Sequence, residues 1–454
     1  MNIRKIVKSL VPTSFFKKVA PTAHLFEAIF YNVIHGFPAR NIKVIGITGT
    51  NGKTSTTFMV HRMLVNAGIN TGLMSTVAYG VNDDIKEQME HMTTVSTPIL
   101  MKRIKAMKKQ GMEWLVLETT SHALAQHRVW GIPYSIAVMT NLTHEHLDYH
   151  GTFEAYRDAK RMMFKQCNRN KRGLRTGIVN VDDENARLFS ADVLNAVGYG
   201  LKKGHIHAGD DLVLAAGGSS YTAVGQKDTY QINCNLPGSF NVSNSLAAVA
   251  VGEAIGLTKE QIEQGIAALK GVEGRMTRVT DGSQPFEVVV DYAHTPDSFE
   301  KLFRDLKPVV KGKLIVMFGS AGRRDEAKRA VQGKLAGEYA DEVVITEEDD
   351  RDMDGIEILN EIAAGAESAG KKRDENLFLI HDRTEAINFA IQRANTGDTV
   401  LLLGKGHEKD ILRNGPKAAE MRAQPQDDHN PDRVVEFAWD EIATAREALE
   451  ALQK

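Results

Sequence analysis

The chain has 454 residues, of which 42% are hydrophobic and 25% are charged, and its formal net charge is −2. This length exceeds one ordinary hydrophobic core, so we expect two or three domains, and the near-neutral charge excludes a general nucleic-acid-binding surface. Cys167 and Cys234 are the two cysteines, which excludes a disulfide scaffold and favours a cytoplasmic protein. The sequence contains no apolar run near the roughly 20 residues of a membrane span.

Residues 1–41 are predicted to form a short basic helical segment. Glu27 is the one acid that counters its basic residues, which are Arg4, Lys5, Lys8, Lys17, Lys18 and Arg40. A secretory signal is disfavoured because Lys17, Lys18 and Pro21 interrupt the apolar residues. We expect these helices to pack on the first domain, and the alternative is an amphipathic segment that lies on a membrane surface.

A glycine-rich loop, GITGTNGKTST at 46–56, lies between an apolar strand at 42–47 and a helix that begins near Thr54. Glycines in such a loop let the backbone N–H groups and the helix N-terminus surround an anion. Lys53 adds a positive charge, and the Thr54 hydroxyl could bind magnesium. Ile47 replaces the first glycine of the strict phosphate-loop pattern, so an ordinary strand–helix turn is the alternative. The residues nevertheless favour a site for a nucleoside triphosphate.

The following pattern predicts an α/β fold in two parts. Buried parallel strands are expected at 113–118 and 135–142, and the segment 177–235 is expected to be a small antiparallel addition. A helix at 257–269 should begin with a capping box between Thr258 and Gln261. After a hinge at 271–276, further strands are predicted at 286–293, 312–319, 341–348, 376–381 and 398–404. We therefore predict a central phosphate-loop-type, mostly parallel domain at 42–271 and a Rossmann-like doubly wound domain at 272–454.

Polar residues follow several of these strands. Glu118 ends one strand and could hold magnesium or cap a helix. His144, His146 and His150 resemble a zinc cluster, but no cysteine or spaced ligand completes it, so we expect one histidine to face magnesium and nucleotide. Lys160, taken alone, would be an ordinary solvated lysine on a helix.

Further candidates lie toward the C-terminus. Asn241 and Asn244 stand near a helix start and are expected to cap it, with contact to a purine edge as the alternative. Arg275 could bind phosphate, Asp291 a ribose, and Tyr292 or His294 a base. The stretch 319–329 offers basic residues, Arg324 among them, and 401–408 offers Lys405, His407 and Glu408 for a polar small molecule.

The ordered motifs resemble those of the Mur ligase family from about residue 42 to 410. They are GTNGKT, ETTSHAL with Gln126 and Arg128 after it, TNLTHEHLDYHG, Tyr156 with Ala159-Lys160, FNVSN, GRM, DYAHTP, GRRD and GKGHE. Any one of them is weak, but the ordered set is specific, and it is most similar to the branch that extends a muramyl dipeptide. The resemblance implies an ATP-dependent ligase that adds a free amino acid through an acyl phosphate, acts as a monomer and contains two magnesium ions.

The resemblance also implies a role for each matching residue. Lys53, His146 and Lys160 would be catalytic, with Lys160 as a carbamate. The ATP-binding residues would be Gly49, Thr50, Asn51, Gly52, Lys53, Thr54, Ser55, Asn241, Asn244, Arg275, Asp291 and His294. The metal ligands would be Thr54, Glu118, His146 and carbamylated Lys160. The substrate-binding residues would be Thr97, Pro98, Ser121, Gln126, Arg128, Arg324, Asp349, Arg351, Gly404 and Glu408.

Two features depart from the family pattern. Only about forty residues precede the first strand, where the family has a UDP-binding domain. We therefore expect a substrate that lacks UDP, an exposed UDP, or a partner that supplies the missing surface. In addition, 348–351 reads Glu-Asp-Asp-Arg where diaminopimelate-adding members have Asp-Asn-Pro-Arg. Arg351 could pair with the extra carboxylate of diaminopimelate, which favours it over lysine, whereas the added acids favour a cationic side chain.

Two other functions are considered. A ligase of the same scaffold similar to folylpolyglutamate synthetase is disfavoured by Gln126, Arg128 and the GKGHE motif. A catalytically silent nucleotide-binding scaffold is disfavoured by the intact set of Lys53, Thr54, Glu118, His146 and Lys160.

Overall fold

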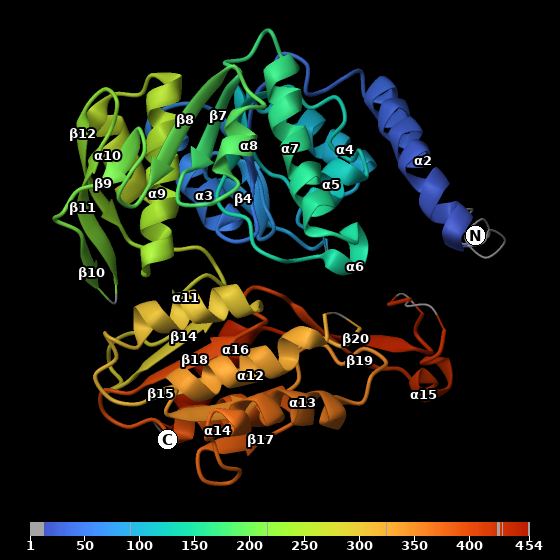
Figure 1. The fold of residues 1–454 in the computed structure, drawn as a ribbon, viewed down its shortest axis with the longest axis vertical. Helices are drawn as coiled ribbons and strands as arrows, with labels where there is room; N and C mark the ends of the chain where they lie inside the picture. Colours follow the sequence, from blue (N-terminus) through green and yellow to red (C-terminus); the bar gives the residue numbers. More distant parts are fainter. Residues whose placement is uncertain are drawn as a thin grey trace. The chain divides into compact units, whose positions relative to one another are not determined.

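The computed structural model describes residues 13–90, 92–215, 217–323, 325–424, 427–428 and 430–452. The chain divides into two compact units, which Figure 1 shows from blue to red along the sequence. Unit 1 comprises the described residues up to 213, with 219–234 and 240–269. Unit 2 comprises the described residues of 214–218, 235–239 and 270 onward.

Unit 1 is built on a large, mostly parallel sheet with helices packed on it. The strands of this sheet are β1 (Lys43–Thr48), β2 (Thr71–Met74), β3 (Ala78–Val81), β4 (Asp84–Glu87), β5 (Trp114–Glu118), β6 (Tyr134–Met139), β7 (Thr176–Asn180), β8 (Asn195–Gly200), β9 (Ile206–Ala208), β10 (Val213–Ala215), β11 (Gly218–Val224) and β12 (Thr229–Cys234). Within it, β10 after Val213 and the first residue of β11 belong to unit 2. Its helices are α2 (Thr13–Ile34), α3 (Lys53–Asn66), α4 (Thr97–Lys109), α5 (Ser121–Ala125), α6 (Leu147–His150), α7 (Phe153–Arg169), α8 (Ala186–Ser190), α9 (Ser239–Ile255) and α10 (Lys259–Ala267).

The centre of this sheet is β1, which pairs in parallel with β5 on one side and β6 on the other. From the centre, one side runs β5-β2-β3-β4 and the other runs β6-β7-β8-β9-β11, with β12 on β11. Val44, Ile45 and Ile47 are all buried, as expected for a parallel strand covered on both faces. The predicted strand at 135–142 ends early, at Met139, because the residues after it leave the sheet to bind the glycine-rich loop.

The predicted antiparallel addition is smaller than 177–235. β7 and β8 continue the parallel sheet, and β9 joins it in parallel with β8. Among the described pairings of this segment, β11 pairs antiparallel with β9 and with β12. The burial pattern gives the reason: β7 is buried throughout, whereas β12 alternates between exposed and buried residues. The predicted capping box is confirmed, because the Gln261 N–H donates to Thr258 Oγ1 and the Thr258 N–H donates to Gln261 Oε1.

The helix α2 packs against α4, and Asn32 Nδ2 donates to the Trp130 carbonyl 3.0 Å away. The first twelve residues of the predicted basic segment lie outside the described residues. Apolar residues remain exposed on α2, including Phe26 (68% exposed) and Phe30 (58%). Within the described ranges, the chain has no helix whose length and apolar content would let it cross a membrane.

Unit 2 contains a six-stranded sheet in the order β13-β14-β18-β15-β16-β17, parallel except for β13 (Figure 1). Its strands are β13 (Thr277–Arg278), β14 (Glu287–Asp291), β15 (Leu314–Phe318), β16 (Glu342–Ile345), β17 (Leu377–Leu379) and β18 (Thr399–Leu403), and β19 (Asp410–Asn414) and β20 (Val434–Ala438) form a separate hairpin. Its helices are α11 (Pro296–Leu306), α12 (Ala327–Tyr339), α13 (Gly355–Ser368), α14 (Arg383–Gln392), α15 (Ala418–Met421) and α16 (Glu441–Leu452). The predicted α/β fold class is confirmed.

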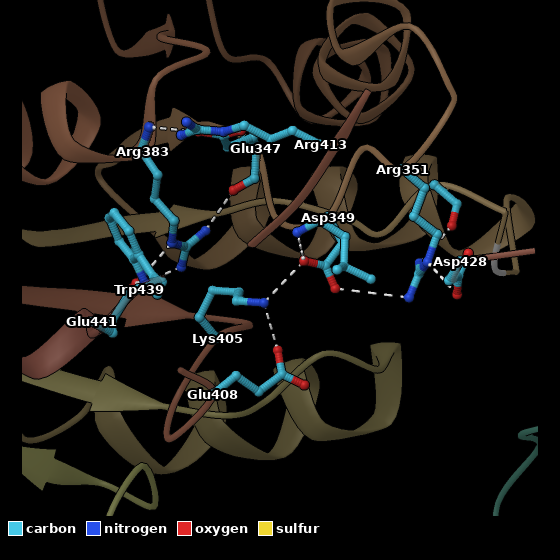
Figure 2. A network of polar contacts seen from close by, with 12 residues as sticks. Glu347, Asp349, Arg351, Arg383, Lys405, Glu408, Arg413, Asp428, Trp439 and Glu441 are labelled. Atoms are coloured by element: carbon cyan, nitrogen blue, oxygen red, sulfur yellow. Dashed lines mark hydrogen bonds and ion pairs between the residues drawn. The ribbon is translucent and has the colours of Figure 1, made fainter. Parts of the chain in front are cut away.

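A buried ion pair connects two helices of unit 2. At the start of α14, Arg383 donates to Glu441 Oε1 at 2.6 Å and to Oε2 at 2.8 Å, and it also donates to the Glu347 and Leu403 carbonyls (Figure 2). Both side chains of the pair are fully buried.

We predict that Arg383→Ala lowers the free energy of unfolding of unit 2 by about 3–5 kcal/mol, because it leaves the Glu441 carboxylate buried without its counter-charge. Arg373→Ala is the matched control. It removes an exposed pair with Glu367 and should cost less than about 1 kcal/mol. Urea unfolding of the full chain, monitored by hydrogen exchange in α14 and α16, measures the free energy of unfolding of both variants. Equal small decreases in the two variants would contradict the prediction.

Candidate active site

The predicted glycine-rich loop connects β1 to α3, and its shape requires glycine at two positions. Gly49 has φ 151° and Gly52 has φ 81°. A Cβ at Gly49 would lie 1.8 Å from Thr140 Oγ1, and a Cβ at Gly52 would lie 2.4 Å from Asn244 Oδ1. Any larger residue would therefore force the loop away from its neighbours.

The residues that follow β6 hold this loop. Asn141 accepts from the Thr50 N–H through its carbonyl (2.8 Å) and from the Asn51 N–H through its Oδ1 (2.9 Å). The Thr143 N–H donates to Thr50 Oγ1, which also lies 3.0 Å from the Tyr156 hydroxyl. Asn141 and Tyr156 were not predicted as site residues, although Asn141 lies in the TNLTHEHLDYHG motif and Tyr156 precedes Ala159-Lys160 in the next one.

The structure brings the predicted Thr54 and Glu118 together. Glu118 is the last residue of β5 and is buried. Its Oε1 accepts from Thr54 Oγ1 at 3.1 Å, and its Oε2 accepts from the Thr76 N–H at 2.9 Å. Hydroxyl and carboxylate oxygens are the ligands that hard divalent cations prefer, so this pair fits a magnesium ion. Ser55, the next residue of α3, is also buried.

Two lysines lie at the loop. Lys160 comes from α7, is 2% exposed, and donates from Nζ to the Gly49 carbonyl at 2.6 Å. Burial lowers the pKa of Lys160 well below its usual range, and the charge of Lys53 lowers it further. Lys53 donates to the Thr50 carbonyl at 2.7 Å. Lys160 is therefore not the solvated lysine that its sequence alone suggests.

The three predicted histidines contact different residues. His144 stacks on Phe153, and His150 Nε2 lies 3.0 Å from Ser121 Oγ. His146 has a positive φ of 56° and places its ring 4.6 Å from His122. His122, which sequence analysis did not single out, has its pKa lowered to about 3, chiefly by burial and then by His146 and His150.

The predicted muramyl-substrate residues of unit 1 lie at the ends of α4 and α5. Thr97 Oγ1 donates to the Arg128 carbonyl at 3.2 Å, and the Arg128 guanidinium donates to the Thr94 carbonyl. Burial lowers the pKa of Arg128 to about 10. Pro98 lies in the first turn of α4, Ser121 begins α5, and Gln126 directly follows the end of α5.

The prediction that Asn241 and Asn244 cap a helix is wrong. α9 begins at Ser239, so both residues lie inside the helix, where they are buried. Asn244 Nδ2 donates to Asn241 Oδ1 at 3.0 Å, and Asn244 also borders Gly52. Their place is therefore beside the glycine-rich loop.

In unit 2, predicted residues gather where β14 ends. The two carboxylate oxygens of Asp291 each accept a backbone N–H, from Met276 and Ala293, at 2.7 Å. Burial raises the pKa of Asp291, and Arg275 opposes that rise. The Arg275 guanidinium lies 4.5 Å from the centre of the Tyr292 ring, and His294 Nδ1 lies 2.9 Å from the Tyr292 carbonyl.

A buried lysine organises the next group (Figure 2). Lys405 Nζ lies 3.0 Å from Asp349 Oδ1 and 2.7 Å from Glu408 Oε2. Burial raises the pKa of Asp349 to about 6, with Lys405 opposing. Burial would also raise the pKa of Glu408, but Lys405 lowers it to about 2. Sequence analysis mentioned Lys405 but did not assign it to the site.

The remaining predicted residues differ in what they contact. Arg351 donates from Nη1 to the Gly322 carbonyl (2.7 Å). Its Nε donates to Asp428 (3.2 Å), as Figure 2 shows. Gly404, after β18, has φ 101°. Arg324 lies outside the described residues. Within the part of the chain that the structure describes, one acidic and histidine group has metal-like spacing, Glu347, Asp350 and His381, but Arg413 already donates to Glu347.

Comparisons with known proteins agree with this arrangement. Residues 47–252 match the Mur ligase middle domain, and residues 274–406 match the Mur ligase glutamate ligase domain. The UDP-N-acetylmuramyl-tripeptide synthetase of Roseiflexus sp. strain RS-1 is 38% identical over 449 residues, which cover 95% of this chain and 83% of the relative.

Two further similarities extend across both units. The UDP-N-acetylmuramoyl-L-alanyl-D-glutamate–2,6-diaminopimelate ligase of Bacillus velezensis is 39% identical over 84% of this chain and 76% of its own. A solved structure of a UDP-N-acetylmuramoyl-L-alanyl-D-glutamate–2,6-diaminopimelate ligase superposes with a TM-score of 0.62 at 28% identity, covering 96% of this chain and 83% of that chain. Since such relatives match both units over most of their length, this chain is a member of the Mur ligase family.

Proposed function

We propose that this chain is an ATP-dependent ligase that adds an amino acid to a muramyl-dipeptide acceptor. The observation that carries the proposal is the group at the glycine-rich loop, to which three elements contribute: α3 provides Lys53 and Thr54, β5 provides Glu118 and α7 provides Lys160. Membership of the Mur ligase family, over most of the length of the tripeptide-forming relatives, supports the same function.

The loop of unit 1 would bind the phosphates of ATP. Its N–H groups and the N-terminus of α3 offer positive dipole ends, and Lys53 supplies a full charge. Thr54 and Glu118 would hold a magnesium ion, and Glu118, His146 and Lys160 a second one. Magnesium bound there would offset the negative charge of the phosphoryl oxygens. In unit 2, we assign Arg275, Asp291 and His294 to nucleotide contacts.

The state of Lys160 fits a carbamate. Carbon dioxide reacts with a neutral amine, forming an N–C bond and releasing one proton, and the lowered pKa of Lys160 favours that amine. The carbamate nitrogen keeps one N–H, which could still donate to the Gly49 carbonyl. The product is an anion, which would turn a buried cation into a metal ligand.

The proposed reaction has two steps. A carboxylate oxygen of the acceptor attacks the γ-phosphorus of ATP, so that ADP leaves and an acyl phosphate forms. The amine of the incoming amino acid then attacks the acyl carbon, loses a proton, and expels phosphate from a tetrahedral intermediate. No protein nucleophile is required, so the chain's residues act by positioning and by charge, with Lys53 at the phosphoryl oxygens.

A single assay tests this function. ADP and product formation are measured with ATP, magnesium, an amino-acid panel, and the muramyl dipeptide either linked to UDP or free of it. We expect turnover that requires all components. A silent scaffold would give none, and a folylpolyglutamate synthetase would turn over only pteroyl substrates with glutamate.

We also propose that the protein is a cytoplasmic monomer whose α2 contacts anionic lipid. The outer side of α2 exposes Phe26, Phe30 and Val33, and the sequence before it is basic. Sedimentation with anionic vesicles should carry down the full chain, and neutral vesicles should not. A variant with Phe26→Ser and Phe30→Ser should stay in the supernatant; equal binding by this variant would refute the contact.

A further inference from the structure

Glu348, which follows β16, is a buried carboxylate with an unsatisfied oxygen. The residue is 7% exposed, and its Oε2 has no hydrogen-bond partner among the residues that the structure describes. A Cβ added to Gly404 would lie 3.0 Å from this oxygen. Burying an ionised carboxylate without a partner is costly, so such a group signals a ligand of opposite charge.

The cations nearest to Glu348 are already engaged. Lys405 is shared by Asp349 and Glu408, so that two carboxylates contact one ammonium group, and Glu348 also raises the pKa of Lys405. Arg383, whose pKa Glu348 also influences, directs its guanidinium to Glu441 and to the Glu347 and Leu403 carbonyls. The surroundings of Glu348 therefore carry excess negative charge.

Arg351 is not placed to bind a second carboxylate of the substrate. Its side chain is 6% exposed, and its guanidinium is directed to Asp428, the Gly322 carbonyl and, at 3.8 Å, Asp349. A carboxylate that approached it would have to displace these acids. Meanwhile Asp350, beside it in the sequence, has its own buried Oδ1 without a partner in the described structure.

We propose that Glu348 binds the side-chain ammonium of the incoming amino acid, so that the enzyme selects a basic amino acid without a second carboxylate, such as lysine or ornithine. Glu348 follows β16 and Gly404 follows β18, at the carboxyl edge of the parallel sheet where doubly wound folds bind ligands. A side chain at position 404 would contact the Glu348 carboxylate, because its Cβ would already lie 3.0 Å from Oε2. This inference rests on the proposed ligase function and replaces the preference for diaminopimelate drawn from Arg351.

The test compares four amino acids in the ligase assay: lysine, ornithine, norleucine and meso-diaminopimelate. Norleucine has the shape of lysine without the ammonium. We expect kcat/KM for lysine to exceed that for norleucine by about 10- to 100-fold, the value of one charge-assisted contact. Lysine should also exceed diaminopimelate by at least about tenfold, since an unpaired carboxylate would meet the acidic group.

Glu348→Gln identifies the residue responsible. It should bring the lysine-to-norleucine ratio close to one, mainly by raising KM for lysine, while turnover of norleucine shows that the variant is folded. Glu357→Gln, an exposed glutamate on α13, is the matched control and should keep the wild-type ratio. A preference for diaminopimelate, or an unchanged ratio in Glu348→Gln, would overturn this inference alone. Absence of turnover with every amino acid would overturn the proposed function as well.

Discussion

Replacing Lys160 with alanine is expected to lower turnover by about 10²–10³-fold or more, which in practice abolishes it. Lys160 Nζ lies 2.6 Å from the Gly49 carbonyl in the same group as Thr54 and Glu118, so the variant removes the proposed carbamate from the phosphate loop. Because alanine has no amine, added bicarbonate should not restore activity. Wild-type enzyme kept free of carbon dioxide should lose activity and regain it with bicarbonate.

A control on the same helix separates this effect from damage to α7. Lys165 is exposed, and Lys165→Ala should leave turnover unchanged. The measurement is ADP release under saturating ATP, with the thermal unfolding midpoint of each variant as a check on folding. Near-normal turnover by Lys160→Ala would remove the carbamate from the mechanism, although the ligase function could still stand.

The sequence was sufficient to predict the residues at the glycine-rich loop because each carries its chemistry in a local pattern. Lys53 and Thr54 follow a strand and begin a helix, and Glu118 ends a neighbouring strand, so the geometry of a parallel sheet brings them to one edge. The ordered motifs also predicted Lys160 as a site residue, which on its own would be interpreted as an exposed lysine.

The residues that hold these groups in place could not be predicted from the sequence in the same way. Asn141 accepts two N–H groups of the loop, and Tyr156 contacts Thr50, but a single asparagine or tyrosine in a sequence has no distinctive spacing. Asn241 and Asn244 were predicted as caps because asparagine favours helix starts, whereas the helix begins two residues earlier than Asn241.

The buried ion pairs of unit 2 show a second limit of prediction from the sequence. Asp349 and Arg351 lie in the loop after β16 and Lys405 lies in the loop after β18, and the sequence does not say which charge will pair with which. In the structure, Lys405 binds Asp349 and Glu408, and Arg351 binds Asp428. Glu348, whose Oε2 has no hydrogen-bond partner among the described residues, could be identified as a candidate only after these pairs were known.

Replacing Lys53 with alanine should lower turnover about as much as Lys160→Ala does, but for a different reason. Lys53 is the first residue of α3, and its Nζ now donates to the Thr50 carbonyl, within the loop that would surround the phosphates. An ammonium group there would offset charge on the phosphoryl oxygens in the transition state, so we expect kcat to fall by about 10²–10³-fold and KM for ATP to rise.

Two further variants test whether the effect of Lys53→Ala depends on the charge and on its position. Lys53→Arg keeps the charge but changes its geometry, and should recover only part of the activity, because a planar guanidinium does not replace a compact ammonium. Lys86→Ala, on the exposed strand β4, should leave kcat and KM unchanged. A non-hydrolysable ATP analogue should raise the thermal unfolding midpoint of the wild type and of Lys86→Ala, and much less that of Lys53→Ala. If Lys53→Ala kept both normal turnover and full protection by the analogue, the loop would not be the phosphate site, and the ligase mechanism built on it would fail.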